Sequence, residues 1–254
     1  MITLGCDPEL FLQTIQGKMI SAVGLIGGTK EEPLPLEVPG CAVQEDNVSA
    51  EFNIPPSKTF QDFKNHIQYV IYHLDAKAHG MGLQLARHVA SHSFDKDQLT
   101  TWQAQVFGCD PDFNAWTERE NPKPQSADFN LRSCGGHIHV GAKLDPVSVI
   151  RSMDLHLGVP SVSLDGDTKR RELYGKAGAH RRKPYGVEYR TLSNFWIWSD
   201  ELIEWAWEGT NKAVEFVQKG KVIPAQIGDH IQRAINLGDK NSQAICLEYL
   251  NATL

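Results

Sequence analysis

Four short segments of the chain concentrate acidic, imidazole and guanidinium side chains. They read Asp7-Pro8-Glu9, Glu45-Asp46-Asn47 followed by Glu51-Phe52-Asn53, His137-Ile138-His139, and Glu188-Tyr189-Arg190. Carboxylates joined by an imidazole make an oxygen-rich site that suits magnesium or manganese, whereas zinc or copper favours more nitrogen or thiolate ligands. Because clustered carboxylates repel one another, a bound cation would offset the cost of bringing them together. The four segments therefore predict a divalent-metal site, with a magnesium-bound nucleotide as its natural occupant.

All four segments alternate in the manner of β-strands, and side chains two positions apart share a face of an extended backbone. The groups that this rule places together are Asp7 with Glu9, His137 with His139, Glu188 with Arg190, and Glu45 with Asn47, Glu51 and Asn53. The two glycines before His137 also allow a close approach of the backbone. We therefore expect the strands that begin near residues 2, 42, 131 and 186 to share one antiparallel sheet.

Helices are expected between these strands. Apolar residues at helical spacing follow Ser57 and Thr59, two natural N-caps, and predict a helix that ends before Gly80. Further helices are expected at residues 147–158, 201–219 and 223–254, strands at residues 2–11, 42–54, 83–89, 131–144 and 186–192, and a loop at residues 111–128. Polar-faced strands interleaved irregularly with helices favour an α+β fold with an antiparallel sheet over a doubly wound parallel sheet.

Composition limits the class of protein. With 254 residues, 41% of them hydrophobic and 22% charged, the chain can bury a core without a stabilising disulfide or structural metal. We expect one catalytic domain over residues 1–254, helical from about residue 200 onward. The five cysteines are scattered and form no C-x-x-C pair, which predicts reduced thiols. The start lacks signal-peptide features and no apolar run approaches membrane-spanning length, which predicts a cytoplasmic protein.

The formal charge of −6 argues against nonspecific nucleic-acid binding, although basic residues gather between Lys169 and Arg190. This basic cluster comprises Arg170, Arg171, Arg181, Arg182 and Lys183, interleaved with Tyr174-Gly175, Gly178 and Tyr185-Gly186. Glycines let the backbone lie close to a ligand, so the alternatives are a phosphate or carboxylate site and a solvated run of charge. The glycine-rich stretch 24–30 lacks the order of a P-loop and is expected to be a turn, in which Lys30 is a candidate ligand contact.

The same motifs resemble those of the glutamine synthetase/glutamate-cysteine ligase superfamily, in the superfamily's order. Gly5-Cys6-Asp7-Pro8-Glu9 resembles its first-strand acid-x-acid metal motif, and Glu51-Phe52 its second metal-binding acid. Gly135-Gly136-His137-Ile138-His139 resembles its glycine-histidine motif, and Glu188-Tyr189-Arg190 its closing E-x-R pair. A bacteriophage branch, the phage phiEco32-like COOH-NH2 ligase type 2 family, is similar in further strings, over roughly residues 1–200. These strings are Gln44-Glu45-Asp46-Asn47-Val48, Gly108-Cys109-Asp110-Pro111-Asp112, Tyr174-Gly175-Lys176-Ala177-Gly178 and Arg181-Arg182-Lys183-Pro184-Tyr185-Gly186.

The resemblance implies a glutamine synthetase-like fold, an antiparallel-rich curved sheet with flanking helices. It also implies an ATP- and magnesium-dependent carboxylate-amine ligase, with manganese as a second option. The candidate metal ligands are Asp7, Glu9, Glu51, His137 and Glu188. The other candidates are Arg190 with Arg181 or Arg182 as phosphoryl contacts, Asp46 as the acceptor base, and Lys30, Arg171, Lys176 and His139 as nucleotide contacts. Two positions depart from the superfamily pattern. Asp7 is shorter than the usual glutamate. Gln44 stands where the superfamily's spacing before Glu51 would place a third metal-binding acid, and Glu45, Asp46 and Asn47 lie beside it.

Three other functions remain open from the sequence: a kinase on the same scaffold, a metal-dependent hydrolase, and a noncatalytic phage protein that binds a nucleotide. Amide formation separates the ligase from the kinase, and ATP dependence separates it from the hydrolase. The expected partners are small-molecule or peptide carboxylate and amine substrates, without a membrane, and with nucleic acid only as a modified-base substrate. For a phage-encoded chain the cytoplasm would be the host's, and the sequence leaves the oligomeric state open.

Overall fold

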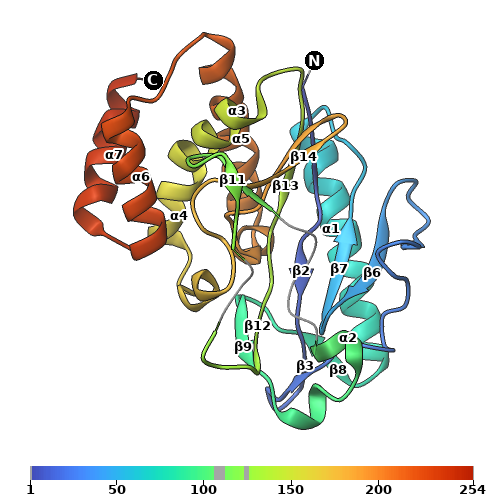
Figure 1. The fold of residues 1–254 in the computed structure, drawn as a ribbon. Coiled ribbons are helices and arrows are strands. Elements are labelled where there is room, and N and C mark those ends of the chain that lie inside the picture. The colour runs from blue at the N-terminus through green and yellow to red at the C-terminus, as the bar shows by residue number, and fades with distance from the viewer. Residues whose placement is uncertain (1, 106–111, 123–125, 254) are drawn as a thin grey trace.

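The computed structural model describes residues 2–105, 112–122 and 126–253, which form an α+β fold whose paired strands are antiparallel (Figure 1). This confirms the predicted fold class. The strands are β1 (Thr3–Cys6), β2 (Glu9–Leu10), β3 (Leu12–Thr14), β4 (Met19–Ile20), β5 (Leu34–Pro35), β6 (Ala42–Asp46), β7 (Ser49–Asn53), β8 (Leu83–Leu85), β9 (Ser91–Ser93), β10 (Phe113–Asn114), β11 (Arg119–Glu120), β12 (Leu131–Ser133), β13 (Ile138–Gly141), β14 (Ala179–Lys183) and β15 (Gly186–Tyr189). The helices are α1 (Phe60–Gly80), α2 (Trp102–Gln105), α3 (Pro146–Met153), α4 (Val159–Leu164), α5 (Asp200–Gln218), α6 (Ala225–Leu237) and α7 (Lys240–Thr253), with short 3₁₀ segments η1 (Lys96–Gln98), η3 (Lys169–Glu172) and η4 (Asn194–Trp198) and a π-helical segment η2 (Asp154–Gly158).

The central sheet has the strand order β1-β13-β15-β14-β10-β11. Its register pairs Ile138 with both Cys6 and Tyr189, so the residues next to these positions lie side by side. A second sheet has the order β2-β7-β6-β5. It contains the β6–β7 hairpin with Glu45, Asp46 and Glu51, which we call the acidic hairpin. The Ile54 N–H donates to the Cys6 carbonyl (3.3 Å) and thereby joins the two sheets. The chain from β1 to β2 therefore takes part in both sheets and brings their acidic segments together.

The expectation of one shared sheet is wrong for residues 42–54 and 131–144. Residues 131–144 form two strands in different sheets, since β12 pairs with β9 and β13 joins the central sheet. Between them the chain makes only an isolated bridge from Gly135 to Ser193, in which the Gly136 N–H donates to the Leu192 carbonyl, and the Gly135 N–H donates to the Glu9 carboxylate. A further small sheet has the order β4-β3-β8.

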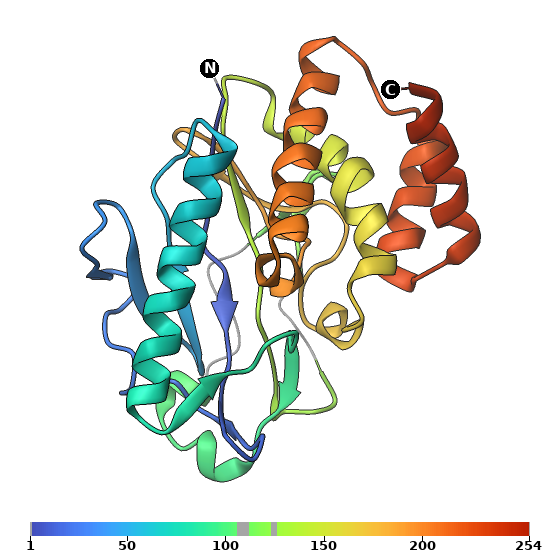
Figure 2. The same cartoon turned by 180° about the vertical axis from the view of Figure 1, so that it is seen from behind.

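Helices cover the back of the joined sheets, and Figure 2 shows α1 and α5 lying across that side. α1 begins where the sequence predicts, because the Thr59 side chain accepts a hydrogen bond from Asp62 N and caps the first turn. Gly80 belongs to the last turn, whereas it was expected beyond the end. The left-handed residue that follows the helix is Gly82, with φ of 72°. The buried face of α1 repeats at helical spacing and consists of Phe63, Ile67, Val70, Leu74 and Ala78.

The polar connection at residues 111–128 contains a short hairpin where a loop was expected. β10 pairs with β11 and with β14, so the hairpin extends the edge of the central sheet. The Asn114 side chain accepts hydrogen bonds from Trp116 N (2.8 Å) and Thr117 N (3.2 Å), and these bonds close the turn. The alternation of apolar residues that predicts a strand is absent here, so the sequence did not indicate the hairpin. The hairpin brings Asp112 to the edge of the site.

The last part of the chain is helical, as predicted for residues 223–254. α6 ends at Gly238, which has φ of 65°, and α7 then packs back against α6 and α4 around its own apolar cluster. Within residues 2–105, 112–122 and 126–253, no helix combines the length and apolar character that a membrane span requires.

Candidate active site

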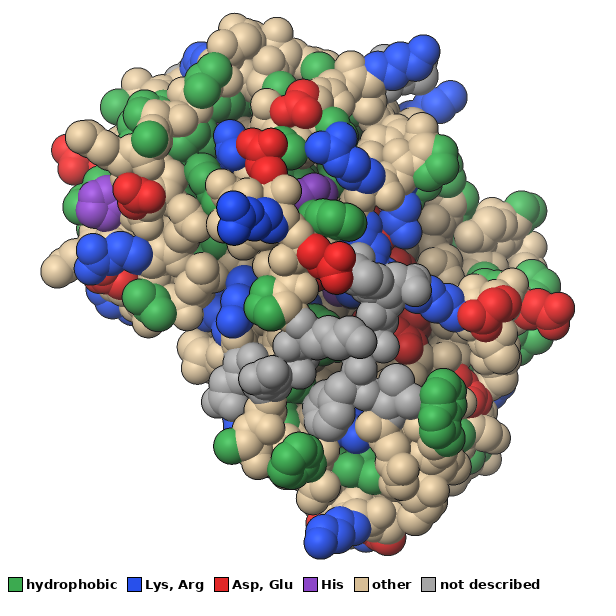
Figure 3. All heavy atoms as spheres, in the orientation of Figure 1, with side chains coloured by type: hydrophobic (Ala, Val, Ile, Leu, Met, Phe, Trp, Pro, Cys, Tyr) green, Lys and Arg blue, Asp and Glu red, His purple; other side chains and the backbone are tan. Residues whose placement is uncertain are grey.

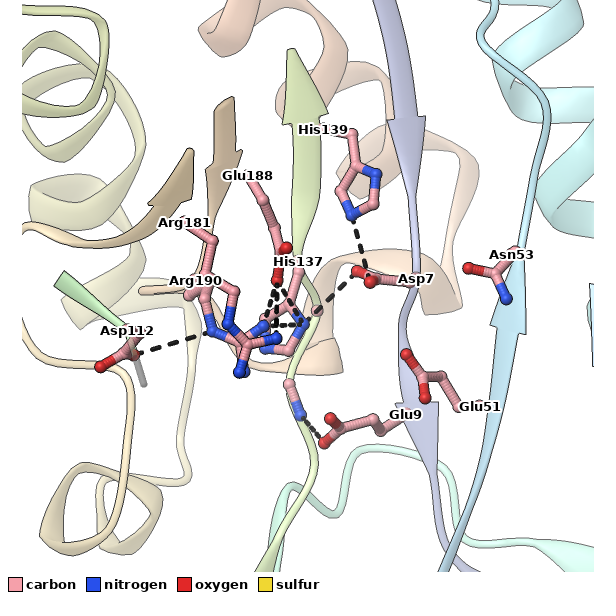
Figure 4. A network of polar contacts seen from close by, with 12 residues as sticks. Asp7, Glu9, Glu51, Asn53, Asp112, His137, His139, Arg181, Glu188 and Arg190 are labelled. Carbon is pink, nitrogen blue, oxygen red and sulfur yellow. Dashed lines mark hydrogen bonds and ion pairs between the residues drawn. The ribbon is translucent and has the colours of Figure 1, made fainter. Parts of the chain in front are cut away.

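The central sheet brings together three candidate metal ligands, Asp7, His137 and Glu188. Asp7 follows β1, His137 precedes β13 and Glu188 lies in β15, so the register sets them side by side (Figure 4). His137 Nδ1 lies 3.4 Å from Asp7 Oδ1 and 3.8 Å from Glu188 Oε1. One ligand atom from each residue lies within 4.8 Å of the other two, a spacing that suits a divalent cation.

Two glycines set the position of His137. A Cβ at Gly135 would lie 2.1 Å from His137 Nε2, and a Cβ at Gly136 would lie 2.2 Å from the Ser193 carbonyl oxygen. The Gly136 carbonyl also accepts a hydrogen bond from Trp196 Nε1 (3.0 Å). The imidazole therefore occupies space that only glycine leaves open.

His139, a candidate nucleotide contact, lies against Asp7. Its Nε2 lies 3.1 Å from Asp7 Oδ2, and its Nδ1 lies 2.8 Å from the Tyr185 hydroxyl. Burial opposes the charged form of His139, but the Asp7 carboxylate outweighs burial and raises the pKa of His139. His139 thus favours the ionised form of Asp7, and its role toward a nucleotide stays a prediction.

The triad Asp7, His137 and Glu188 has the protonation states that metal ligands need near neutral pH. Burial disfavours charge on Asp7, yet His139 and His137 outweigh burial and hold the pKa of Asp7 well below its usual range. Burial and Asp7 also oppose ionisation of Glu188, but Arg190 and the imidazoles lower its pKa to about 2. Burial and Arg190 lower the pKa of His137 to about 4. Two carboxylates and a neutral imidazole are therefore available to a cation.

A second pair of acids, Glu9 and Glu51, lies beside the triad. The β2–β7 register places them directly opposite each other, and the two residues are 9% and 7% exposed. Both carboxylates accept hydrogen bonds from neutral donors, Glu9 from Gly135 N (2.6 Å) and Glu51 from Gln44 Nε2 (2.7 Å). Burial and then Asp46 raise the pKa of Glu9 to about 7, and burial and neighbouring carboxylates raise the pKa of Glu51 well above its ordinary value. A cation bound here would relieve this repulsion.

The β6–β7 hairpin places Gln44, and not Glu45, opposite Glu51. The register pairs Gln44 with Glu51, so even-numbered positions of β6 share a face with odd-numbered positions of β7. The expectation that Glu45 shares the face of Glu51 is wrong, because the two-residue turn between the strands couples opposite parities. Glu45 instead anchors the glycine-rich loop, where it accepts hydrogen bonds from the backbone N–H groups of Gly24 (2.9 Å), Ile26 (3.0 Å) and Gly27 (2.8 Å).

A pocket of about 400 Å³ opens beside the triad of Asp7, His137 and Glu188 and the pair of Glu9 and Glu51. Its lining includes the guanidinium groups of Arg132 and Arg170 and the rings of Trp102 and Tyr174. On the face that Figure 1 presents, acidic and basic side chains lie interspersed around the middle of the molecule (Figure 3). The candidates from the sequence that line the pocket are Glu9, Lys30, Asp46, His137 and Arg190.

Arg132 and Trp102 were not predicted as part of the site. The Arg132 guanidinium donates to the Ala104 carbonyl (Nη2, 2.7 Å) and to Asn47 Oδ1 (Nε, 3.1 Å), so it ties α2 to the turn of the acidic hairpin. This brings the exposed Trp102 ring to the pocket rim. These contacts join segments far apart in the chain, and no local pattern signals them.

Arg190 and Arg181 lie on the site side of their strands. Arg190 Nη1 donates to Glu188 Oε1, and Arg190 Nε lies 3.7 Å from Asp112 Oδ2. Arg181 pairs with Glu188 in the β14–β15 register, with Nη1 4.0 Å from Glu188 Oε1. Strand alternation turns Arg182 to the other face, where it is exposed, and so favours Arg181 as the phosphoryl contact.

Three nucleotide-contact candidates, His139, Arg171 and Lys176, are not among the residues that line the pocket. Arg171 is half-buried and Lys176 is exposed, and neither contributes to the lining that the described ranges provide. Their roles stay predictions. Lys183, which was grouped only with the basic cluster, has its Nζ 2.7 Å from Glu188 Oε2. The string at residues 108–112 lies outside the described residues except for Asp112.

The fold and the site together are those of an α+β protein with a polar pocket. Its antiparallel sheets gather carboxylates, an imidazole and buried arginines around that pocket, a set of groups suited to binding charged ligands. The model of a family of carboxylate-amine ligases, Phage phiEco32-like COOH.NH2 ligase-type 2, matches residues 124–217. That stretch carries His137, Arg181, Glu188 and Arg190, and the match confirms the family resemblance for the motifs that lie within it. No curated protein sequence matches the chain.

Proposed function

We propose that the chain is an ATP- and magnesium-dependent carboxylate-amine ligase that forms an amide bond through an acyl phosphate. The observation that carries this proposal is a pocket lined by the buried acid Glu9 and the half-buried Asp46, together with the buried arginines Arg132, Arg170 and Arg190. Acids hold metal-bound phosphates, and arginines neutralise a phosphoryl group in transfer, so the pocket offers both functions. The matched family, by its name, joins a carboxyl group to an amine.

The chain's own donors fit magnesium in two neighbouring places. Asp7, His137 and Glu188 form one set, and Glu9 with Glu51 forms the other. The raised pKa values of the second pair support this proposal, because a cation favours the ionised carboxylates that burial disfavours. When bound, magnesium supplies neutralising charge at the phosphate oxygens, and manganese suits the same donors.

The remaining residues would act on the nucleotide and the substrates. The substrate carboxylate attacks the γ-phosphorus of ATP, which forms an acyl phosphate and releases ADP; an amine then displaces phosphate to give the amide. Arg190, with Arg181 beside it, would stabilise the charge on the transferred group. Asp46, which lines the pocket, would accept the proton of the amine. The nucleotide contacts that we propose are Lys30, Arg171, Lys176 and His139.

The proposed substrates are small molecules or peptides that carry a carboxylate or an amine. The test measures ADP release across amino acids and peptides, followed by mass spectrometry for a condensed product. An amide formed together with ADP and phosphate supports the ligase. A phosphorylated product without an amide would show a kinase, and substrate cleavage without a nucleotide would show a hydrolase.

Glu51→Gln tests the second acid pair directly. Glutamine keeps the size of the side chain and an oxygen that accepts from Gln44, but it supplies no ligand charge. We expect magnesium-ATP affinity to fall roughly tenfold to hundredfold while the fold is retained. Calorimetry gives the affinity, and Glu248→Gln on exposed α7 is the matched control. Wild-type affinity in Glu51→Gln would remove Glu51 from the metal site.

A further inference from the structure

One wall of the pocket contains a buried guanidinium that the mechanism above does not use. Arg170 lies in η3, is 3% exposed and lines the pocket. Its Nη1 donates to the Thr191 carbonyl (3.0 Å) and its Nη2 to the Arg190 carbonyl (3.3 Å). A guanidinium has five N–H groups, so three remain after these two. Its Nε has no hydrogen-bond partner among the residues that the structure describes.

The positive charge of Arg170 also lacks a close counter-ion. Within the described ranges, Glu9 and Asp165 act on it only from beyond ion-pair distance, and Asp165 is bonded to the Ser193 hydroxyl (2.8 Å). Burial lowers the pKa of Arg170, and Arg190 adds to this effect. A buried charge without a partner is costly, and an anion brought by a ligand would remove that cost.

The backbone is shaped around this guanidinium. Gly175 has φ of 76°, and a Cβ there would lie 1.9 Å from Arg170 Nη1 and 2.8 Å from the Thr191 carbonyl oxygen. The Tyr174 N–H donates to the Arg170 carbonyl (2.9 Å), and Tyr174 itself lines the pocket. The segment from η3 to Gly175 therefore folds over the guanidinium while leaving it open toward the pocket.

We propose that Arg170 is an oxyanion receptor that binds a carboxylate or phosphate oxygen of a molecule in the pocket, next to Arg190. This inference rests on the proposed function only in taking the pocket as the substrate site. A planar fork with free N–H groups matches the two oxygens of either anion. Glu9 and Asp46 line the same pocket, so the bound molecule meets positive charge at one wall and acids at another.

The test measures anion binding without turnover, in wild type and in Arg170→Gln. Inorganic phosphate and ADP form one arm, acetate and glutarate form the other, and potassium chloride at equal ionic strength controls for screening. We expect Arg170→Gln to weaken one arm by about tenfold to hundredfold, and the affected arm identifies the source of the oxyanion. Arg233→Gln removes the same charge from the exposed end of α6 and should leave both arms at wild-type affinity.

Arg170→Lys serves where the glutamine variant does not fold, since it keeps the charge but loses the planar fork, and it should also weaken the affected arm. A structure of the wild-type protein with the tightest probe should place its oxygens within hydrogen-bond distance of the Arg170 guanidinium. Both arms unchanged in a folded variant, no binding by wild type, or a probe bound elsewhere would each overturn the proposal. Amide formation with intact anion binding in Arg170→Gln would overturn this inference alone; anion binding at Arg170 without any amide would overturn the ligase alone.

Discussion

Glu9 is a buried acid of the site whose pKa is raised to about 7. Burial raises its pKa first and Asp46 adds to this, while the Gly135 N–H and two arginines oppose them, so that the pKa is about 7. Asp7, in contrast, is held in its ionised form by the histidines. The charge of the proposed metal ligands therefore changes between pH 6 and pH 8 through Glu9.

We expect magnesium affinity in the presence of ATP to rise with pH from 6 to 8, because the ligand form of Glu9 is the carboxylate and the pKa of Glu9 is about 7. At pH 6, binding should release protons, which calorimetry in buffers of different ionisation enthalpy detects. Glu9→Gln should reduce that proton release. Without metal the sign for stability is opposite: the folded state holds this proton more tightly than the unfolded chain, so stability falls as pH rises from about 4.3 toward 7. A magnesium affinity that is flat from pH 6 to pH 8 would contradict the role of Glu9.

Arg190 is expected to act on the transition state more than on nucleotide binding. Its guanidinium contacts Glu188 and Arg190 lines the pocket, where in the proposed reaction phosphoryl oxygens would gather charge during transfer. Arg190→Lys keeps the charge but loses the planar fork, and should lower turnover by roughly 100-fold, about 3 kcal/mol, with little change in nucleotide affinity. Steady-state kinetics and calorimetry separate the two effects, with Arg233→Lys as the control. Equal turnover in wild type and Arg190→Lys would exclude Arg190 from the mechanism.

At the scale of elements, local signals could be read from the sequence and distant contacts could not. The Thr59 cap and the helical spacing after it predict α1, and strand alternation predicts that Glu188 and Arg190 share a face, as their contact confirms. The register of the β6–β7 hairpin depends on a two-residue turn, which the parity argument did not include. Arg170 lines the pocket and Arg171 does not, because η3 turns only one of the two adjacent arginines inward. The sequence around the two arginines gives no sign of which one that is.

The glycine-rich loop depends on one side chain of β6. Three backbone N–H groups converge on the Glu45 carboxylate, and Lys30 follows them in the pocket wall. Glu45→Gln leaves one acceptor oxygen and introduces two donors facing N–H groups, so stability should fall by about 1–2 kcal/mol. Backbone hydrogen exchange at residues 24–27 should rise, and the apparent KM for ATP should rise with it. Glu37→Gln, exposed on the following segment, is the control, and unchanged exchange in Glu45→Gln would show that the loop holds without this anchor.

At the scale of the whole molecule, one buried carboxylate connects the β10–β11 hairpin, the π-helical segment η2 and the central sheet. Asp154 is fully buried in η2 and accepts hydrogen bonds from Trp116 Nε1 (2.7 Å), Gly178 N (2.6 Å), the Tyr189 hydroxyl (2.8 Å) and the Thr191 hydroxyl (3.2 Å). Burial raises its pKa to about 7 although all four donors lower it. Strand β15, which carries Glu188 and ends just before Arg190, is therefore held through Tyr189 by Asp154.

Asp154→Asn should destabilise the protein by roughly 2–4 kcal/mol, because the amide NH2 faces donors that then lose their acceptor. Denaturant unfolding measures the change, and Asp229→Asn on exposed α6 is the matched control. Residual activity should fall at temperatures where the folded fraction is unchanged, since β15 loses its support. An unfolding free energy within about 0.5 kcal/mol of wild type would show that the donors are satisfied without Asp154.

Gly135 and Gly136 provide a sequence marker for the packing around His137. The Cβ positions at these glycines are already filled, by the His137 ring at one and the Ser193 carbonyl at the other. Alanine or a larger residue at Gly135 would displace the imidazole, and the same change at Gly136 would displace the Ser193 carbonyl that packs beside it. We expect a relative with either change to lack a cation site of the kind proposed here. This dipeptide, more than overall similarity, should therefore separate relatives that keep the proposed site from relatives that have lost it.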